Sequence, residues 1–352
     1  MSAWIRGTFL GLLCALLASC ASVTLPPEAE RPPPLVTRVA GDSGLVDLRG
    51  QFRATLCALL ADRRGRGCES LLTRMGAEPA GAGVTSDSAT LAARFRLAIV
   101  PGFLAECLAP ANRPFAVATE ALRADGFDVT YLRAAGRGRV EHNALQLAAE
   151  LAALPEDPRP LVIIAYSKGL PDMLAALADR PTLQQSVAAV VSLAGAANGS
   201  LLAERYESIY RVLLSRLPLG DCDAGDGSEI HDLRRDVRHR WWQANGRRIT
   251  VPIYSLVAVP EPERVSTLLR PAHARLSELD PFNDGQLLWT DAVAVPGALL
   301  GYINADHWGI AMRLSSTLPG AGLLIEDDVP RVELLLAALA VIDARIGPSP
   351  AR

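Results

Sequence analysis

The stretch Leu161 to Gly169, LVIIAYSKG, combines a strand pattern with the start of a helix. Its first six residues are apolar or aromatic, which is typical of a strand covered on both faces of a parallel sheet. Pro171 suits the first turn of the helix that follows, because no N–H is needed there. Ser167 lies between them, with the small residues Ala165 and Gly169 two positions on either side. The stretch therefore predicts a tight turn that pushes the serine side chain out of the sheet.

The sequence AYSKG (165–169) resembles the G-x-S-x-G nucleophile elbow of the α/β-hydrolases, with Ala in place of the first Gly, as in some bacterial lipases. The resemblance implies that Ser167 is the nucleophile of a hydrolase that cleaves esters through an acyl-enzyme. The alternative is a serine that caps a helix in a non-catalytic turn. The strand before Ser167 and the helix after it favour the elbow.

Short apolar runs on both sides of this stretch predict a sheet. The expected strands are 97–100, 127–132, 161–166, 187–195, 253–259 and, more weakly, 298–303, and the helices between the first four are 115–124, 141–154 and 171–178. Strands that alternate with helices favour right-handed crossovers, a mostly parallel sheet and an active site at the carboxyl ends of the strands. Together with this pattern, the resemblance of the elbow implies an α/β-hydrolase fold over 91–346, with a central sheet flanked by helices. The Arg-rich interval 200–250 resembles the helical cap that such folds insert after the sixth strand.

A serine nucleophile needs a base and an acid that orients the base. In α/β-hydrolases the chain order is serine, acid, histidine, and the histidine follows the last strand. Of five histidines, only His307, in YINADHWG (302–309), fits this order. The turn Asn283-Asp284-Gly285 resembles the acid turn of bacterial lipases and assigns Asp284 as the partner of His307. Asp280, earlier in the same loop, is the alternative.

The intermediate of acyl transfer carries an oxyanion that needs two N–H donors. One expected donor is the backbone N–H of Lys168, directly after the serine. The sequence VPGFLAE (100–106) resembles the H-G-[FL] oxyanion turn of lipases, with Pro101 in place of His. That resemblance implies the N–H of Phe103 as the second donor.

Lys168 is also the only lysine of the chain, among 34 arginines. A cation at the start of a helix opposes the helix dipole, so its side chain calls for an explanation. Asp172, four residues later, and Glu106, in the oxyanion loop, are the candidate partners for an ion pair. The alternative, which we favour slightly, is a solvated side chain of which only the backbone N–H matters.

The first residues of the chain predict an export signal. Arg6 and a short apolar stretch precede LASC, which ends at Cys20 and resembles the lipobox of bacterial lipoproteins. The resemblance implies that residues 1–19 are removed and that Cys20 is acylated; Ala21 in place of Asp favours the outer membrane of a bacterial cell envelope. A cleaved secretory signal with an incidental cysteine is the alternative. The Pro-rich segment 20–44 predicts an extended tether, and 45–90 predicts a helical segment before the hydrolase domain.

Four further cysteines, Cys57, Cys68, Cys107 and Cys222, remain after the signal and Cys20 are set aside. An even number in an oxidising compartment favours disulfides. Cys57 and Cys68 flank a predicted turn between two short helices, so we pair them. Cys107 and Cys222 then pair by elimination, with free buried thiols as the alternative. No cysteine has the spacing of a zinc site, and we expect neither a metal nor a cofactor.

The charge balance bears on partners. Removal of the signal takes away only Arg6 and leaves 34 basic against 38 acidic side chains, which does not favour nucleic acid. The sequence thus predicts a membrane-anchored serine hydrolase of ester or lipid substrates. The alternatives are an acyltransferase or thioesterase with the same triad, and a non-catalytic lipoprotein that binds a hydrophobic ligand or a protein partner. No pattern in the sequence predicts an oligomeric state.

Overall fold

The computed structural model describes residues 44–61, 67–216, 222, 225–316, 320, 322 and 324–347. The predicted signal peptide, Cys20 and nearly all of the predicted tether lie outside the described residues. In the part of the chain that is described, no helix has the length and apolar character needed to cross a membrane.

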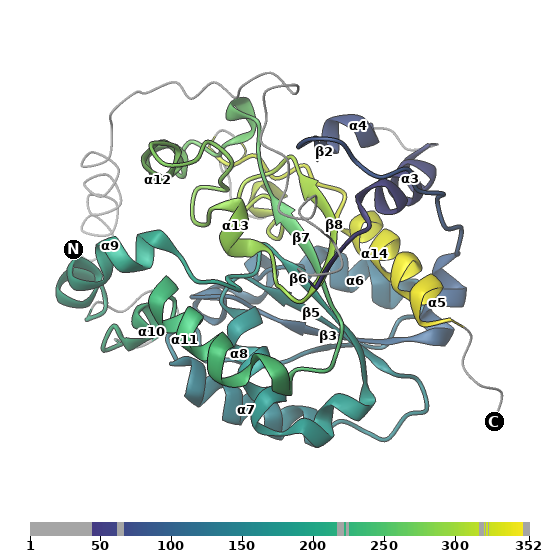
Figure 1. Cartoon of the computed structure of the whole chain (residues 1–352), viewed down its shortest axis with the longest axis horizontal. Helices are drawn as coiled ribbons and strands as arrows, with labels where there is room; N and C mark the ends of the chain where they lie inside the picture. The colour runs from purple at the N-terminus through teal and green to yellow at the C-terminus, as the bar shows by residue number, and fades with distance from the viewer. Residues whose placement is uncertain are drawn as a thin grey trace.

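Eight strands form one sheet in the order β1-β8-β7-β6-β5-β3-β4, and β2 pairs with β8 off this path (Figure 1). Every pairing is parallel except that of β2 with β8. The strands are β1 (Leu45–Asp47), β2 (Leu72–Thr73), β3 (Arg96–Val100), β4 (Val129–Tyr131), β5 (Leu161–Tyr166), β6 (Val187–Leu193), β7 (Ile253–Ala258) and β8 (Gly297–Ile303). The predicted fold class, a mostly parallel sheet flanked by helices, is confirmed.

Helices cover both faces of the sheet (Figure 1). They are α3 (Arg49–Leu60), α4 (Cys68–Leu71), α5 (Ser88–Arg94), α6 (Ala116–Ala124), α7 (Val140–Ala152), α8 (Gly169–Asp179), α9 (Leu201–Ile209), α10 (Ser228–His231), α11 (Arg235–Asn245), α12 (Arg270–Ser277), α13 (Trp289–Ala292) and α14 (Arg331–Ile346). Alternate side chains of β5 lie in different hydrophobic clusters. Val162 and Ile164 belong to the cluster that includes α14, whereas Leu161, Ile163 and Ala165 belong to the cluster that includes α7 and α8. This alternation follows from the two-residue period of a strand.

The segment 45–90, predicted to be helical, also contributes two strands, so that part of the prediction is wrong. Leu45 to Asp47 pair with Gly297 to Leu299 at one edge of the sheet. Leu45 is buried there. A three-residue strand is too short to show alternation, and its conformation is determined by the partner strand.

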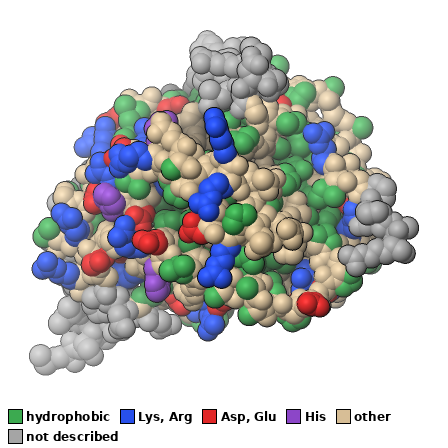
Figure 2. All heavy atoms as spheres, turned by 60° about the horizontal axis from the view of Figure 1, so that its bottom comes forward, with side chains coloured by type: hydrophobic (Ala, Val, Ile, Leu, Met, Phe, Trp, Pro, Cys, Tyr) green, Lys and Arg blue, Asp and Glu red, His purple; other side chains and the backbone are tan. Residues whose placement is uncertain are grey.

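Between β6 and β7 the chain forms α9, the π-helical turn η6 (Tyr210–Leu214), α10 and α11, in the interval predicted for the cap. Basic and acidic side chains lie side by side on this part of the surface (Figure 2). Arg234, for example, pairs with Glu207 and Asp236, and Arg240 pairs with Asp236. Charges of the two signs are therefore interspersed on this part of the surface.

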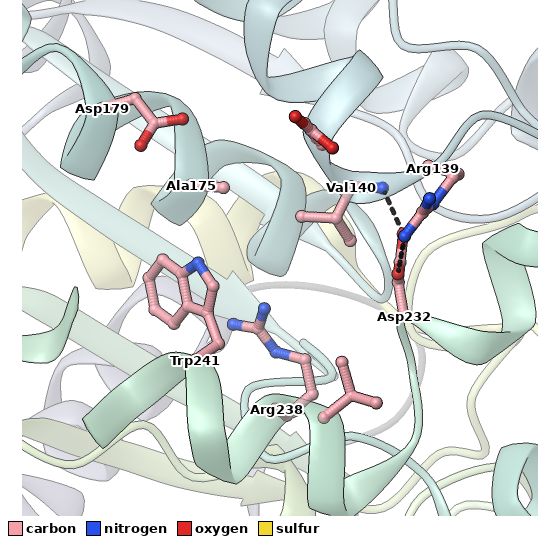
Figure 3. A pocket seen from close by; sticks show the side chains of 9 residues that line it. Arg139, Val140, Ala175, Asp179, Asp232, Arg238 and Trp241 are labelled. Atoms are coloured by element: carbon pink, nitrogen blue, oxygen red, sulfur yellow. Dashed lines mark hydrogen bonds and ion pairs between the residues drawn. The ribbon is translucent and has the colours of Figure 1, made fainter. Parts of the chain in front are cut away.

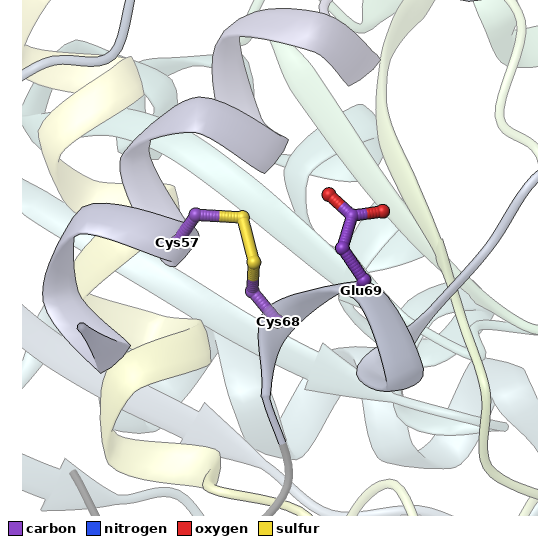
Figure 4. A group of neighbouring side chains, drawn as sticks. All are labelled: Cys57, Cys68 and Glu69. Atoms are coloured by element: carbon purple, nitrogen blue, oxygen red, sulfur yellow. A yellow bond between two sulfur atoms is a disulfide. The ribbon is translucent and has the colours of Figure 1, made fainter.

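Two disulfides join the four cysteines in the predicted pairs, Cys57 with Cys68 and Cys107 with Cys222. Glu69 lies next to the first pair (Figure 4). Because these two sulfurs are bonded to each other, they do not form a thiolate metal site with Glu69. That carboxylate pairs instead with Arg53 and Arg74.

Candidate active site

Ser167 lies at the junction of β5 and α8 in a strained backbone conformation. Its φ of 52° falls in the left-handed region, which non-glycine residues rarely adopt. A Cβ on Gly169 would lie 2.4 Å from the carbonyl oxygen of Pro101, so only glycine fits at that position. Ala165 is fully buried. The small residues on either side of Ser167 thus permit the tight turn that the sequence predicted.

The structure brings Ser167, His307 and Asp284 together in one hydrogen-bonded chain. The Nε2 atom of His307 lies 2.9 Å from Ser167 Oγ, and its Nδ1 atom lies 2.7 Å from Asp284 Oδ2. The carboxylate of Asp284 accepts a hydrogen bond from Nδ1 of His307, so the neutral imidazole carries its proton on Nδ1. All three residues are buried, and Ser167 is the most exposed of them at 8 %. His307 Nε2 is thereby free to accept the serine proton.

The acid and the base are each fixed by neighbouring groups. Asp284 Oδ1 accepts hydrogen bonds from the backbone N–H groups of Gln286 (2.8 Å) and Leu287 (2.6 Å). The hydroxyl of Tyr166 donates to the carbonyl oxygen of His307 at 2.8 Å, and the two rings lie 5.3 Å apart. No pattern in the sequence indicates this contact of Tyr166, although the residue directly precedes the serine.

The alternative acid, Asp280, has other partners. Its carboxylate accepts hydrogen bonds from the indole N–H of Trp289 and the backbone N–H of Phe282, both at 2.9 Å. Asp306, next to His307 in the chain, accepts hydrogen bonds from the N–H groups of Trp308 and Gly309 in its own loop and from the N–H of Ser266. The carboxylate that contacts His307 is therefore that of Asp284.

The other four histidines do not contact Ser167. His142 is exposed, His231 pairs with Glu207, and His239 contacts Gln243. His273 is buried on α12, and burial lowers its pKa to about 4. It is therefore neutral at physiological pH.

The two expected oxyanion donors lie on segments that meet at Ser167. A Cβ on Gly102 would lie 2.8 Å from the Cβ atom of Ser167, so the loop after β3 passes directly beside the serine. Phe103 follows Gly102, and Lys168 follows the serine. Within the described residues, the backbone N–H groups of Phe103 and Lys168 have no hydrogen-bond acceptor. Both donors are thus available to a ligand.

The side chain of Lys168 is buried, so the prediction that it is solvated is wrong. Its Nζ atom lies 2.7 and 2.8 Å from the two carboxylate oxygens of Asp172, which also accept from Asn143 at 2.7 Å. Burial raises the pKa of Asp172, and Lys168 and Asn143 oppose that rise. Glu106, the other candidate partner, accepts from the N–H of Gly136.

A mostly parallel sheet, a strained serine between β5 and α8, and a histidine after β8 define an α/β-hydrolase. No protein-family model and no curated protein matches the chain. Among solved structures, the metagenomic carboxyl esterase MGS0156 is 33 % identical, with a TM-score of 0.77, and the match covers 95 % of this chain and 99 % of that one. The chain therefore belongs to the same family as this carboxyl esterase.

The Staphylococcus hyicus lipase shares the fold. It has a TM-score of 0.52 and 11 % identity, and the match covers 72 % of this chain and 96 % of the lipase.

Proposed function

We propose that this protein is a serine hydrolase of carboxylic esters, with Ser167 as nucleophile, His307 as general base and acid, and Asp284 as the residue that orients His307. The observation that carries this proposal is the hydrogen-bonded chain from Ser167 Oγ through His307 to Asp284, with distances of 2.9 and 2.7 Å. Membership in the family of a carboxyl esterase supports esters as the substrate class.

In the proposed reaction Ser167 Oγ attacks the ester carbonyl carbon while its proton passes to His307 Nε2. The carbonyl oxygen becomes an oxyanion and accepts hydrogen bonds from the N–H groups of Phe103 and Lys168. Collapse of this intermediate breaks the bond to the alcohol, which leaves with the proton held by His307. Water then attacks the carbonyl carbon of the acyl-serine while its proton passes to His307 Nε2. His307 returns this proton to Ser167 Oγ as the carboxylic acid is released.

Hydrolysis of p-nitrophenyl esters with acyl chains from acetate to palmitate tests this proposal. The protein should hydrolyse the series, and Ser167→Ala should lower kcat/KM by about three to six orders of magnitude, as removal of a triad residue does. Ser192, a buried serine on β6 that pairs with Ala165, provides a matched control, and Ser192→Ala should remain active. Undiminished hydrolysis by folded Ser167→Ala protein would contradict the proposal.

We further propose that the enzyme is exported and anchored to a bacterial membrane by a lipid on Cys20. The membrane that we propose is the outer membrane. LASC at the end of a short apolar stretch supports lipidation, and two disulfides fit an oxidising compartment. Cys20→Ser should move the protein from the membrane fraction to the soluble periplasmic fraction, or leave the signal uncleaved. An unchanged membrane fraction, with no incorporation of labelled palmitate into the wild type, would contradict the anchor.

A further inference from the structure

A cavity of about 300 Å³ lies between α7, α8 and α11 (Figure 3). Its apolar walls are Val140, Ala175, Val237 and Trp241. Ser167, His307 and Asp284 are not among the residues that line the cavity. The cavity is therefore separate from the proposed site of ester cleavage. Its volume is at the lower end of the range for small-molecule sites, roughly 300 to 1,000 Å³.

The guanidinium of Arg238 reaches into this cavity between Trp241 and Val140 (Figure 3). Arg238 is 1 % exposed, and its guanidinium carbon lies 4.5 Å from the centre of the Trp241 ring. Its Nε atom donates a long hydrogen bond of 3.4 Å to the carbonyl oxygen of Ala197. Its Nη2 atom is buried and has no hydrogen-bond acceptor among the described residues. Burial lowers the pKa of Arg238 to about 10, so the group is still a cation at neutral pH.

The carboxylates that act on Arg238 are already engaged elsewhere. Asp232 accepts from the N–H of Val140 at 2.8 Å and pairs with Arg139. Asp172 is bound by Lys168. Neither lies within ion-pair distance of Arg238, although both favour its charge. A buried donor without an acceptor is costly, and an anion in the cavity would remove that cost.

We infer that this cavity is a binding site for a small carboxylate with a short aliphatic chain. The carboxylate accepts hydrogen bonds from Nη2 of Arg238, since guanidinium and carboxylate are well matched in geometry and charge. The aliphatic chain packs against Val140, Ala175 and the ring of Trp241. The acidic side chains Glu141, Asp179 and Asp232 also line the cavity and disfavour ligands with several negative charges.

Calorimetric titration of the purified protein with hexanoate, at constant ionic strength, tests the ligand class. Hexanamide and hexylammonium have the same number of carbon atoms as hexanoate but carry no negative charge. Hexanoate should bind saturably at one site, and the two analogues should bind about tenfold more weakly or worse, because a charge-assisted hydrogen bond is lost. Equal binding of hexanamide or hexylammonium would overturn the assignment to a carboxylate.

Two kinds of variant locate the site. Arg238→Met removes the donor, and Ala175→Leu fills the cavity from α8 while Arg238 stays in place; both should weaken hexanoate binding about tenfold or more. Val237→Phe fills the cavity from α11 and should act like Ala175→Leu. Arg240→Met, which removes an exposed cation from the same helix, should bind like the wild type. Unchanged binding in a folded cavity-filling variant would overturn the inference, because the carboxylate would then bind elsewhere.

Discussion

The Nζ atom of Lys168 lies 2.7 and 2.8 Å from the two carboxylate oxygens of Asp172, one helical turn away, and both side chains are buried. This pair ties the residue after the proposed nucleophile to the first turn of α8. The backbone N–H of Lys168 is one of the two proposed oxyanion donors, so the ion pair helps to fix the position of that N–H. The only lysine of the chain therefore has a structural role next to the proposed nucleophile.

Lys168→Met should destabilise the protein. It leaves the carboxylate of Asp172 buried without its cation, and loss of one partner of a buried ion pair costs about 3 to 5 kcal/mol. The double variant Lys168→Met/Asp172→Leu should lose less, because no unpaired charge remains. Urea denaturation of the three proteins measures these differences. A wild-type free energy of unfolding for Lys168→Met would show that the pair contributes nothing to folding.

Replacement of the two candidate acids should have unequal effects. Asp284→Asn should lower kcat by about four orders of magnitude, since the amide favours the wrong tautomer of His307. Asp280→Asn should change kcat little, because Asp280 bonds to Trp289 and Phe282 instead of His307. Steady-state kinetics on a p-nitrophenyl ester compares the two. The reverse ranking would move the acid role to Asp280.

The two disulfides should differ in their effect on catalysis. Cys107–Cys222 ties the end of the oxyanion loop, at the 3-10 turn η3 (Ala105–Cys107), to the interval between β6 and β7. Its removal by double substitution to Ala should lower both kcat/KM and stability, the latter by about 5 kcal/mol for so long a loop. Removal of Cys57–Cys68, the matched control, should cost about 3 kcal/mol and leave kcat/KM unchanged. Equal kinetics for both variants would show that the first disulfide does not position the loop.

Asp291 on α13 should make stability depend on pH. Burial raises its pKa from 3.8 to about 7, although Arg235 pairs with it. Between about pH 4 and 7 the folded state therefore binds a proton that the unfolded state has released. Stability consequently rises as pH falls through this interval, by at most about 1.4 kcal/mol per pH unit.

Asp291→Asn should remove the pH dependence that this carboxyl gives to stability. The difference in unfolding free energy between the variant and the wild type should therefore vary with pH between about 4 and 7. Asp236→Asn, which removes a more exposed carboxylate on α11, is the control and should keep the slope of the wild type. A difference between Asp291→Asn and the wild type that is constant over this pH range would contradict the raised pKa.

The sheet was predictable because its central strands are continuous apolar runs. The predicted strand 161–166 matches β5, and 253–259 matches β7 to within one residue. The place of Ser167 in a tight turn was predictable from the small residues on either side, and the contact of His307 with it from the chain order of the α/β-hydrolases. Local pattern and order carry this information without any knowledge of distant contacts.

Features that depend on distant packing were not predictable. Asp172, the partner of buried Lys168, accepts a hydrogen bond from Asn143 on α7 and lies in the field of the Arg238 charge on α11. Neither helix is near Lys168 in the sequence. The strand state of Leu45 to Asp47 likewise comes from its pairing with β8, some 250 residues later. The cavity at Arg238 has no sequence signal, since it exists only where three helices meet.

Intact-mass spectrometry after treatment with a fluorophosphonate shows whether Ser167 is the nucleophile. Such reagents phosphonylate a serine only when a neighbouring base activates it. The wild type should gain one phosphonyl group, located by peptide mapping on Ser167, and lose ester hydrolysis in proportion. Ser167→Ala should gain none, and His307→Ala should react far more slowly. An unmodified wild type, or modification of a serine other than Ser167, would show that Ser167 is not the nucleophile.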